Sequence, residues 1–426
     1  RHNKRVVGAD LYNEVRRDLL HDPNWGHGDT RDWFAASQRV GDRILTEANP
    51  DLLIIVEGIN WTGLPVDGLP HGRPTLEPVR HLSHTLVKSH KLVYSAHFYG
   101  YTGPNHSGAS GLGETTDPRY QDLGREELYQ VLRRQAFYVA SESGTHFTAP
   151  VWISEFGVGG REETSAKARQ WFHNFTDYLV ATDADFAYWP LVGFHEGRRG
   201  NGWALVHWDS SGRRMGLFDG DDWRADAWSK LVAAEGKTGP VEREDTWDML
   251  APDHGDAVQS LRMRALPDWD PGARKAVCPD GQRLIGLAHT GNRGLCTDAV
   301  RPGLWAAGGG HTVVRDERYV DGEDWAAGYT KLECPRGSFL IGYSVRGAAV
   351  SAALCAESGK DTLGTGGRTV WFDRGDQRPP KAKGGDFAHG RYKGQCADDE
   401  YAAGIAYTGR FGSWRTPDAL LCVRLG

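Results

Sequence analysis

The sequence predicts an α/β domain followed by an all-β domain, and two patterns support this division. In the first half of the 426 residues, short aliphatic runs alternate with segments of helical spacing, which is typical of β/α units. In the second half, one pattern of Asp, aromatic, Lys and Cys residues occurs three times. The length also exceeds the roughly 250–300 residues at which single cores stop growing. We therefore place the α/β domain at residues 1–235, a linker at 236–246 and the repeat domain at 247–426.

Five apolar runs in the first domain are short, rich in β-branched residues and bounded by turn residues. They predict buried parallel strands at residues 6–11, 52–58, 92–99, 151–158 and 186–193. Apolar residues at helical spacing predict helices near residues 33–44, 128–139 and 171–179, which would serve as the crossovers that parallel strands require. A closed (β/α)8 barrel, or TIM barrel, has eight such units. In a barrel the first three strands would therefore precede Arg1.

Each copy in the second domain has a Cys ten residues after its Asp, and the first Cys of successive copies are 56 and 62 residues apart. Threefold repetition of short strands predicts an all-β module such as a β-trefoil or a β-prism. A repeat unit is most simply closed on itself, so we predict the disulfides Cys278–Cys296, Cys334–Cys355 and Cys396–Cys422. Zinc is the alternative, but no copy has the close Cys or His spacing of a structural zinc site.

Composition excludes several function classes. The net charge of −6 provides no basic surface for nucleic acid, and the longest apolar stretches are far shorter than the ~20 residues of a membrane span. Six Cys confined to one region, together with glycosylation sequons at Asn60, Asn105 and Asn174, favour a secreted, extracellular glycoprotein. The opening at Arg1 has no signal-peptide pattern, which suggests a processed or truncated start.

Two carboxylates, Glu14 and Glu155, follow predicted strands directly. Because the carboxyl ends of parallel barrel strands meet at one pocket, we expect these side chains to lie close together. Retaining cleavage of a glycosidic bond needs one carboxylate as nucleophile and one carboxylic acid, about 5–5.5 Å apart. His97 and Tyr99 share one face of a strand and could orient the nucleophile, while Asn13 places an amide beside the acid.

Aromatic residues in loops could hold a sugar. Trp189 could form the floor of the pocket, and Trp61 could stack a sugar in a flanking subsite. The other candidates for flanking subsites, for which packing is the preferred interpretation, are Trp25, Trp203 and Trp208. For the aromatic residues that open each repeat, a core role is preferred over a sugar platform. Glu57 is a competing carboxylate that we interpret as supporting, and Asp10 and Asp209 are interpreted as structural.

The runs Val-Val-Gly-Ala-Asp-Leu-Tyr-Asn-Glu, Val-Tyr-Ser-Ala-His-Phe-Tyr, Ile-Ser-Glu-Phe-Gly and Tyr-Trp occur in this order. They resemble strands four, six, seven and eight of glycoside hydrolase family 5, the cellulase family, over residues 1 to about 235. The resemblance implies a barrel without metal or organic cofactor. It further implies the following roles: Glu14 as acid/base, Glu155 as nucleophile, Asn13 as the 2-hydroxyl contact, His97 and Tyr99 as the supporting pair, and Trp189 as the sugar floor.

The sequence departs from the family pattern in two ways. Val15 replaces the Pro that commonly follows Asn-Glu, and the family's Arg on strand two and His on strand three have no counterpart. A partial barrel would leave an open sheet edge, so we expect strands one to three to come from an N-terminal segment or a second chain.

The implied activity is that of a retaining, endoglucanase-like β-glycosidase acting on a β-linked polysaccharide or glycoconjugate, with an optimum at mildly acidic pH. The alternative is a non-catalytic, lectin-like secreted protein in which the repeat domain binds carbohydrate.

Overall fold

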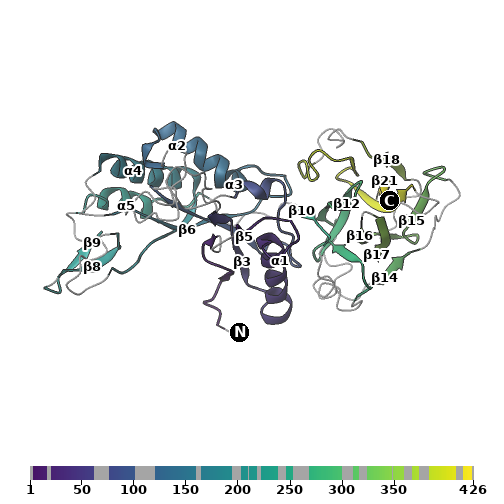
Figure 1. Ribbon diagram of the computed structural model, residues 1–426, viewed down its shortest axis with the longest axis horizontal. Coiled ribbons are helices and arrows are strands. Elements are labelled where there is room, and N and C mark those ends of the chain that lie inside the picture. The colour runs from purple at the N-terminus through teal and green to yellow at the C-terminus, as the bar shows by residue number, and fades with distance from the viewer. Residues whose placement is uncertain are drawn as a thin grey trace.

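The computed structural model describes residues 3–16, 21–61, 76–100, 120–159, 165–193, 203–209, 211–217, 222–237, 246–252, 268–299, 310–315, 324–347, 349–358, 367–373, 383–408 and 416–424. The α/β part and the all-β part lie side by side, with α1 and α3 facing the strands of the second part (Figure 1). None of the helices in these ranges has the length and hydrophobicity that a bilayer-spanning segment needs.

The first part is built on one parallel sheet with the strand order β1-β3-β5-β6-β7. All five strands form where the apolar runs predicted them. They are β1 (Gly8–Asp10), β3 (Leu53–Glu57), β5 (Leu92–Tyr99), β6 (Val151–Gly157) and β7 (Asp185–Tyr188). The last strand ends at Tyr188, five residues earlier than expected, and the nearby Pro190 has no N–H to continue a ladder. The prediction of the parallel sheet is therefore confirmed.

Helices form at each predicted crossover. The helices of this part are α1 (Trp33–Arg43), α2 (Arg125–Leu132), α3 (Tyr138–Ser141), α4 (Ala166–Thr182) and α5 (Ala225–Val232), of which α5 follows the last strand of the sheet. The irregular turns are η1 (Ile44–Ala48), η2 (Glu77–Arg80), η3 (Tyr120–Asp122) and η4 (Arg133–Phe137). Side-chain caps start two of these helices: Asp32 accepts from the Ala35 N–H, and Ser165 accepts from the Ala168 N–H. Between β3 and β5, the short turn η2 is the only helical element of the described residues.

The core of the first part is aromatic. Phe175 of α4 is fully buried and packs against Phe98 of β5 and Phe156 of β6. Two short two-stranded ladders sit beside the main sheet: β2 (Val15–Arg16) with β4 (Ile59–Trp61), and β8 (Val206–Trp208) with β9 (Arg214–Gly216). The first ladder begins directly after Glu14 and holds the start of that loop against the end of β3.

The second part contains three four-stranded antiparallel sheets, ordered β10-β13-β12-β19, β11-β16-β17-β14 and β15-β20-β21-β18. Three separate sheets fit a β-prism rather than a β-trefoil. The strands are β10 (Trp247–Leu250), β11 (Arg274–Val277), β12 (Gln282–Ala288), β13 (Gly294–Asp298), β14 (His311–Val314), β15 (Thr330–Glu333), β16 (Ser338–Arg346), β17 (Ala349–Glu357), β18 (Arg368–Trp371), β19 (Lys393–Gln395), β20 (Glu400–Tyr407) and β21 (Pro417–Arg424).

Each copy gives one strand to its neighbour. Of the four strands in a copy, the second pairs with the third strand of the next copy: β11 with β16, β15 with β20, and β19 with β12 of the first copy. The repeated glycines make this approach possible. A Cβ at Gly286 would lie 2.9 Å from Phe387, and one at Gly404 would lie 3.0 Å from Trp325, each an aromatic residue of another copy. The three copies thus form a closed ring.

The repeated Asp and Lys form an ion pair in each copy. Lys275, Lys331 and Lys393 are almost fully buried, and their Nζ atoms lie 2.8, 2.7 and 2.5 Å from the carboxylates of Asp268, Asp324 and Asp386. Each Nζ also donates to backbone carbonyls of its own loop. The aromatic residues that open the repeats pack inward, since Trp269 and Phe387 are buried and Trp325 is half-buried. The preferred core role is consistent with this burial.

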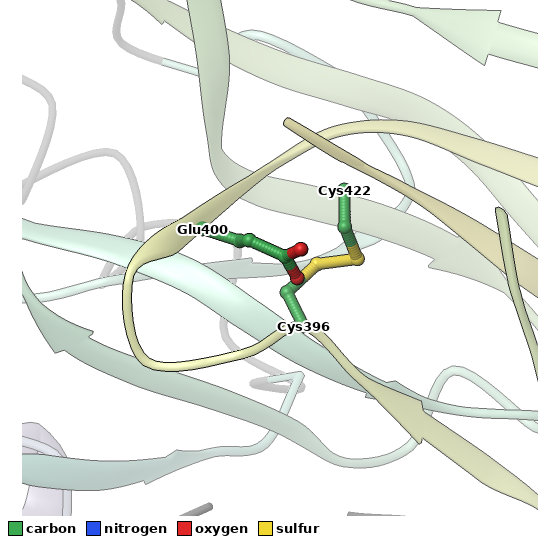
Figure 2. A group of neighbouring side chains, drawn as sticks. All are labelled: Cys396, Glu400 and Cys422. Carbon is green, nitrogen blue, oxygen red and sulfur yellow. A yellow bond between two sulfur atoms is a disulfide. The ribbon is translucent and has the colours of Figure 1, made fainter. Parts of the chain in front are cut away.

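The three predicted disulfides form, with Cα–Cα distances of 5.8, 5.7 and 5.5 Å for Cys278–Cys296, Cys334–Cys355 and Cys396–Cys422. These distances lie in the usual range for a disulfide. Figure 2 shows the third bond with Glu400 beside it. Because its sulfurs are bonded to each other, this group of two Cys and one Glu has no thiolate to offer a metal ion.

Removal of one disulfide should destabilise the repeat domain measurably. The Cys334→Ser/Cys355→Ser double variant frees a loop of 21 residues, which should lower the free energy of unfolding by about 3 kcal/mol. Urea denaturation monitored by circular dichroism would measure this loss. Equal midpoints for the variant and the parent protein, both under oxidising conditions, would contradict the prediction.

The two parts share a hydrophobic cluster. Phe34 and Leu82 of the first part are buried in the same cluster as Met249 and Leu250 of β10. Polar contacts reinforce it, including the Lys88–Asp280 ion pair at 2.5 Å and two backbone hydrogen bonds that join Gly384 to the loop at 144–146. Of the expected linker at 236–246, residues 238–245 lie outside the described residues.

Candidate active site

The parallel sheet brings four polar side chains to the carboxyl ends of its strands. In the register of β5 and β6, His97 lies opposite Glu155, and Tyr99 lies two residues further along β5 on the same face. Glu57 ends β3 on the other side of β5, and Glu14 follows β1. Residues that are 141 positions apart in sequence, Glu14 and Glu155, therefore meet at one edge of the sheet.

Glu14, His97 and Glu155 form the centre of this cluster. One ligand atom from each of the three lies within 4.8 Å of the others, so the two carboxylates are close neighbours. The Nδ1 atom of His97 lies 3.2 Å from Oε1 of Glu14 and 3.5 Å from Oε2 of Glu155. The Tyr99 hydroxyl donates to Oε2 of Glu155 at 2.6 Å. The predicted supporting pair therefore contacts both predicted catalytic carboxylates.

Glu57 lies behind this group and positions it. Its Oε1 lies 2.5 Å from Nε2 of His97, and its Oε2 accepts a hydrogen bond of 2.5 Å from the backbone N–H of Glu14. Glu14 has a φ of 52°, a left-handed conformation that a non-glycine residue adopts only when its surroundings enforce it. Because Glu57 is buried, it supports the cluster from behind and does not face an opening.

The carboxylates and His97 shift each other's proton affinity. Burial opposes the charging of His97, but hydrogen bonds to Glu14 and Glu57 outweigh it and raise the pKa of His97 to about 10. Burial raises the pKa of Glu155, whereas the positive His97 and the Tyr99 hydroxyl counteract this shift. At neutral pH, His97 is therefore a cation among three acidic side chains.

A family model described as "Cellulase (glycosyl hydrolase family 5)" matches residues 2–194. An endoglucanase from Paenibacillus polymyxa is 29% identical over 193 residues, which are 45% of this chain and 43% of the relative. The chain thus spans less than half the length of this relative. Residues 2–194 belong to glycosyl hydrolase family 5.

Solved structures with similarity to this family 5 segment are also cellulases. An endocellulase from Pyrococcus horikoshii, crystallised with cellotetraose, is 23% identical and has a TM-score of 0.33; the match covers 53% of this chain and 56% of that chain. The catalytic domain of the major endoglucanase from Xanthomonas campestris is 21% identical with a TM-score of 0.34, covering 53% and 55%.

Aromatic side chains border the cluster of the family 5 segment. Trp189 follows β7, is 42% exposed, and meets the Tyr99 ring edge-to-face at a centroid distance of 6.5 Å. Trp203 contacts the same ring at 5.9 Å. Gly157 is required here because a Cβ at this position would lie 2.3 Å from the Trp189 carbonyl oxygen. Trp189 thus has an exposed ring face beside the cluster, and its role as a sugar floor stays a prediction.

The other predicted site residues have different surroundings. Asn13 is exposed beside Glu14. Trp61 ends β4, and its side chain lies outside the described part of the chain. Trp25 is no platform, because its indole packs against Phe34 and donates to the Leu82 carbonyl. Trp208 is half-buried in β8.

Two acidic residues interpreted as structural differ from each other. Asp209 closes a turn by accepting from Ser211 and Arg213, as expected. Asp10, at the end of β1, interacts electrostatically with the cluster. Partial burial and the negative charge of Glu57 raise the pKa of Asp10 to about 6. Sequence reasoning missed this coupling. Its position at a strand end, four residues before Glu14, is the signal that could have revealed it.

Two of the three predicted glycosylation sites cannot be compared with the structure. Residue 105 and the side chain of residue 60 lie outside the part of the chain that the structure describes. Asn174 lies in the middle of α4, and its Nδ2 atom is buried. This position disfavours a glycan at Asn174 in the folded chain.

Glu14, His97 and Glu155 also have the spacing of a metal-ligand group. Both ring nitrogens of His97 lie against carboxylates, Nδ1 against Glu14 and Nε2 against Glu57. The charges of this group therefore fit proton transfer and electrostatic stabilisation in the family 5 segment.

Stability should fall as the pH rises above neutrality, because of His97. Its pKa is about 10 in the fold and about 6.5 in an unfolded chain, so between these values the folded state binds more protons. Its stabilising contribution is complete below about pH 6.5 and is lost as the pH rises toward 10. Urea unfolding at pH 7, 8 and 9 should show this decline, and the His97→Gln variant should show a smaller one. Parallel declines in both proteins would contradict the assignment.

Proposed function

We propose that this protein is a retaining β-glycoside hydrolase in which Glu155 is the nucleophile and Glu14 is the acid/base. The observation that carries the proposal is the proximity of the two carboxylates, whose atoms lie within 4.8 Å of each other and of His97. A retaining mechanism needs carboxyl groups about 5–5.5 Å apart, whereas an inverting one needs a wider gap of about 6.5–9.5 Å to admit water. Membership of residues 2–194 in family 5 supports the same chemistry.

In the first step, Glu155 attacks the anomeric carbon while Glu14 donates its proton to the departing glycosidic oxygen. The covalent glycosyl-enzyme is then hydrolysed by water that has given a proton back to Glu14, which releases the sugar with retained configuration. Tyr99 and the cationic His97 stabilise the negative charge of Glu155 before the attack and after its release. Asn13 would contact the 2-hydroxyl group, and Trp189 would support the sugar ring.

We propose a β-linked glucan as the substrate class. The relatives that support this choice are an endoglucanase and endocellulases, one of them crystallised with cellotetraose. Trp189 fits this class, because an exposed indole face matches the apolar C–H face of a pyranose ring. Mannans and glycoconjugates are the other β-linked candidates.

The same proposal includes the architecture. We regard residues 1–235 as strands four to eight of a (β/α)8 barrel, residues 236–246 as a linker, and residues 247–426 as a prism module that could bind carbohydrate. In the described residues β1 pairs only with β3, and the nearby Val6 and Val7 are exposed, which supports further strands beyond β1. The comparisons give no support to a second chain as their source. Three disulfides favour secretion to an oxidising compartment.

A hydrolysis screen tests this function. The full chain is incubated with β-glucans, mannans and aryl β-glycosides, and the products are analysed by chromatography and by proton NMR of the anomeric signal. We expect oligosaccharide release from a β-glucan and initial formation of the β-anomer. Binding of glucan without release of reducing ends would instead support the non-catalytic, lectin-like alternative.

A further inference from the structure

A cavity of about 270 Å³ lies at the boundary between the two parts of the protein, away from the carboxylate cluster. The first part contributes the start of α1, including Phe34 and the N-cap residue Asp32. The second part contributes three arginines, Arg274, Arg293 and Arg391. The cavity is smaller than the ~300–1,000 Å³ of drug-sized ligand sites, so it would suit a molecule no larger than a monosaccharide.

The three arginines form no ion pair with any described residue. Arg274 donates to the Gly347 carbonyl oxygen at 2.9 Å, and Arg293 donates to the Asn292 carbonyl oxygen at 2.6 Å. Arg391 is exposed, and its guanidinium has no hydrogen bond to a described residue. Each guanidinium carries five N–H donors, so most of their donors remain available.

The positive charges also act on one another. Burial and the neighbouring Arg391 lower the pKa of Arg293, which shows that these two cations are close enough to repel. Tyr343 is fully buried near Arg274 and Arg293, and its hydroxyl has no hydrogen-bond partner among the described residues. A buried hydroxyl donor without an acceptor thus lies close to the arginines that line the cavity.

Asp32 does not neutralise this group. Its Oδ1 accepts from the backbone N–H groups of Gly26 and Ala35, and its Oδ2 accepts from Gly28. The carboxylate is thus used to cap α1 and to hold the preceding loop. Of the described residues that line the cavity, Asp32 is the only acid, against three arginines, so a net positive charge remains.

We propose that this cavity binds an oxyanion carried on a sugar-sized molecule, and that the favoured ligand is the carboxylate of a uronic acid. The planar guanidinium fork matches a carboxylate with two parallel hydrogen bonds. Phe34 and Leu82 give the cavity an apolar wall that a pyranose ring could contact. The choice of a sugar rests on the proposed function, whereas the choice of an oxyanion rests on the arginines alone.

The cavity and the carboxylate cluster share one segment of chain. Trp33 begins α1 beside the lining residue Phe34, and its indole N–H donates to the Glu57 carbonyl oxygen at 2.8 Å. Two successive residues of α1 therefore contact the end of β3 and the cavity.

Calorimetric titration tests this proposal on the full chain carrying Glu155→Gln, so that no turnover interferes. The probes are glucuronate, glucose and inorganic phosphate, each at low and at high NaCl concentration. We expect glucuronate to bind more weakly at high salt, and glucose to bind at least tenfold more weakly than glucuronate. Arg391→Gln should weaken glucuronate binding about tenfold or more. The same loss is expected for Arg293→Gln.

Matched controls keep the result interpretable. Arg391 is exposed, so its replacement should leave the unfolding midpoint unchanged even if Arg293→Gln disturbs folding. Arg43→Gln, at the opposite end of α1 about 15 Å away, should bind glucuronate like the parent. Failure of glucuronate to bind, binding of phosphate alone, or binding that is unchanged in Arg391→Gln would each overturn the proposal. Because none of these readouts uses hydrolysis, they are separate from a failure of the proposed activity.

Discussion

Replacement of Glu155 by glutamine is expected to lower kcat by about four orders of magnitude or more, out of the 10⁶-fold or greater acceleration typical of enzymes. Glutamine keeps the size of the side chain and its hydrogen bond from Tyr99, but its neutral amide cannot form the covalent glycosyl intermediate. Initial rates on an aryl β-glycoside would measure the loss. Circular dichroism would confirm that the variant is folded.

Two further variants distinguish the roles of the neighbouring acids. Glu14→Gln should lose most activity on a glucan but retain more on aryl glycosides with acidic leaving groups, because these depart without protonation. Glu57→Gln should cost less than Glu155→Gln, since Glu57 contacts His97 and the backbone of Glu14. Near-native activity in Glu155→Gln, or a greater loss in Glu57→Gln, would show that the nucleophile is misassigned.

The second large effect is expected at Arg224, which is completely buried before α5. Its guanidinium pairs with Asp222 at 2.7 Å and donates to the carbonyl oxygens of Val158 and Trp203 and to the Tyr188 hydroxyl. Arg224→Met leaves the buried carboxylate of Asp222 without its cationic partner, which should lower the free energy of unfolding by about 3–5 kcal/mol. Urea denaturation of both proteins would measure this difference.

Two comparisons test the cause of that loss. The Asp222→Leu/Arg224→Met double variant removes both charges and should be more stable than the single variant. The exposed Arg424 pairs with Asp399 at the surface, so Arg424→Met should change stability by about 1 kcal/mol or less. If the double variant were less stable than Arg224→Met, the unpaired charge would not be the cause.

The strands of the α/β part were predictable because each is a short apolar run bounded by turn residues. The disulfides were predictable for a different reason: the spacing of Asp, Lys and Cys repeats three times, and Cys334 and Cys355 mark the same positions as their equivalents. The exchange of strands between copies was not predictable. The sequence pattern of a strand such as β11 is the same whether the strand pairs within its own copy or, as observed, with β16 of the next copy.

The candidate carboxylates were found from their positions at strand ends. The contacts that position these carboxylates were not predicted. Nothing in the local sequence shows that Glu57 contacts both a ring nitrogen of His97 and the backbone N–H of Glu14. The contact between the two parts was also unpredicted. Trp25 and Phe34 look like loop and helix residues in sequence, and only the packing of β10 against them explains why they are buried together.

The pairing of β19 with β12 joins the last copy of the module to the first. An open array of repeats can lengthen or shorten by one unit, since each addition creates the same contact at a free end. In this ring, loss of one copy would remove a strand from the sheet of one neighbour and would leave the donated strand of the other neighbour without a partner. An additional copy could enter this module only if the closing pair of β19 with β12 were broken and formed again around it.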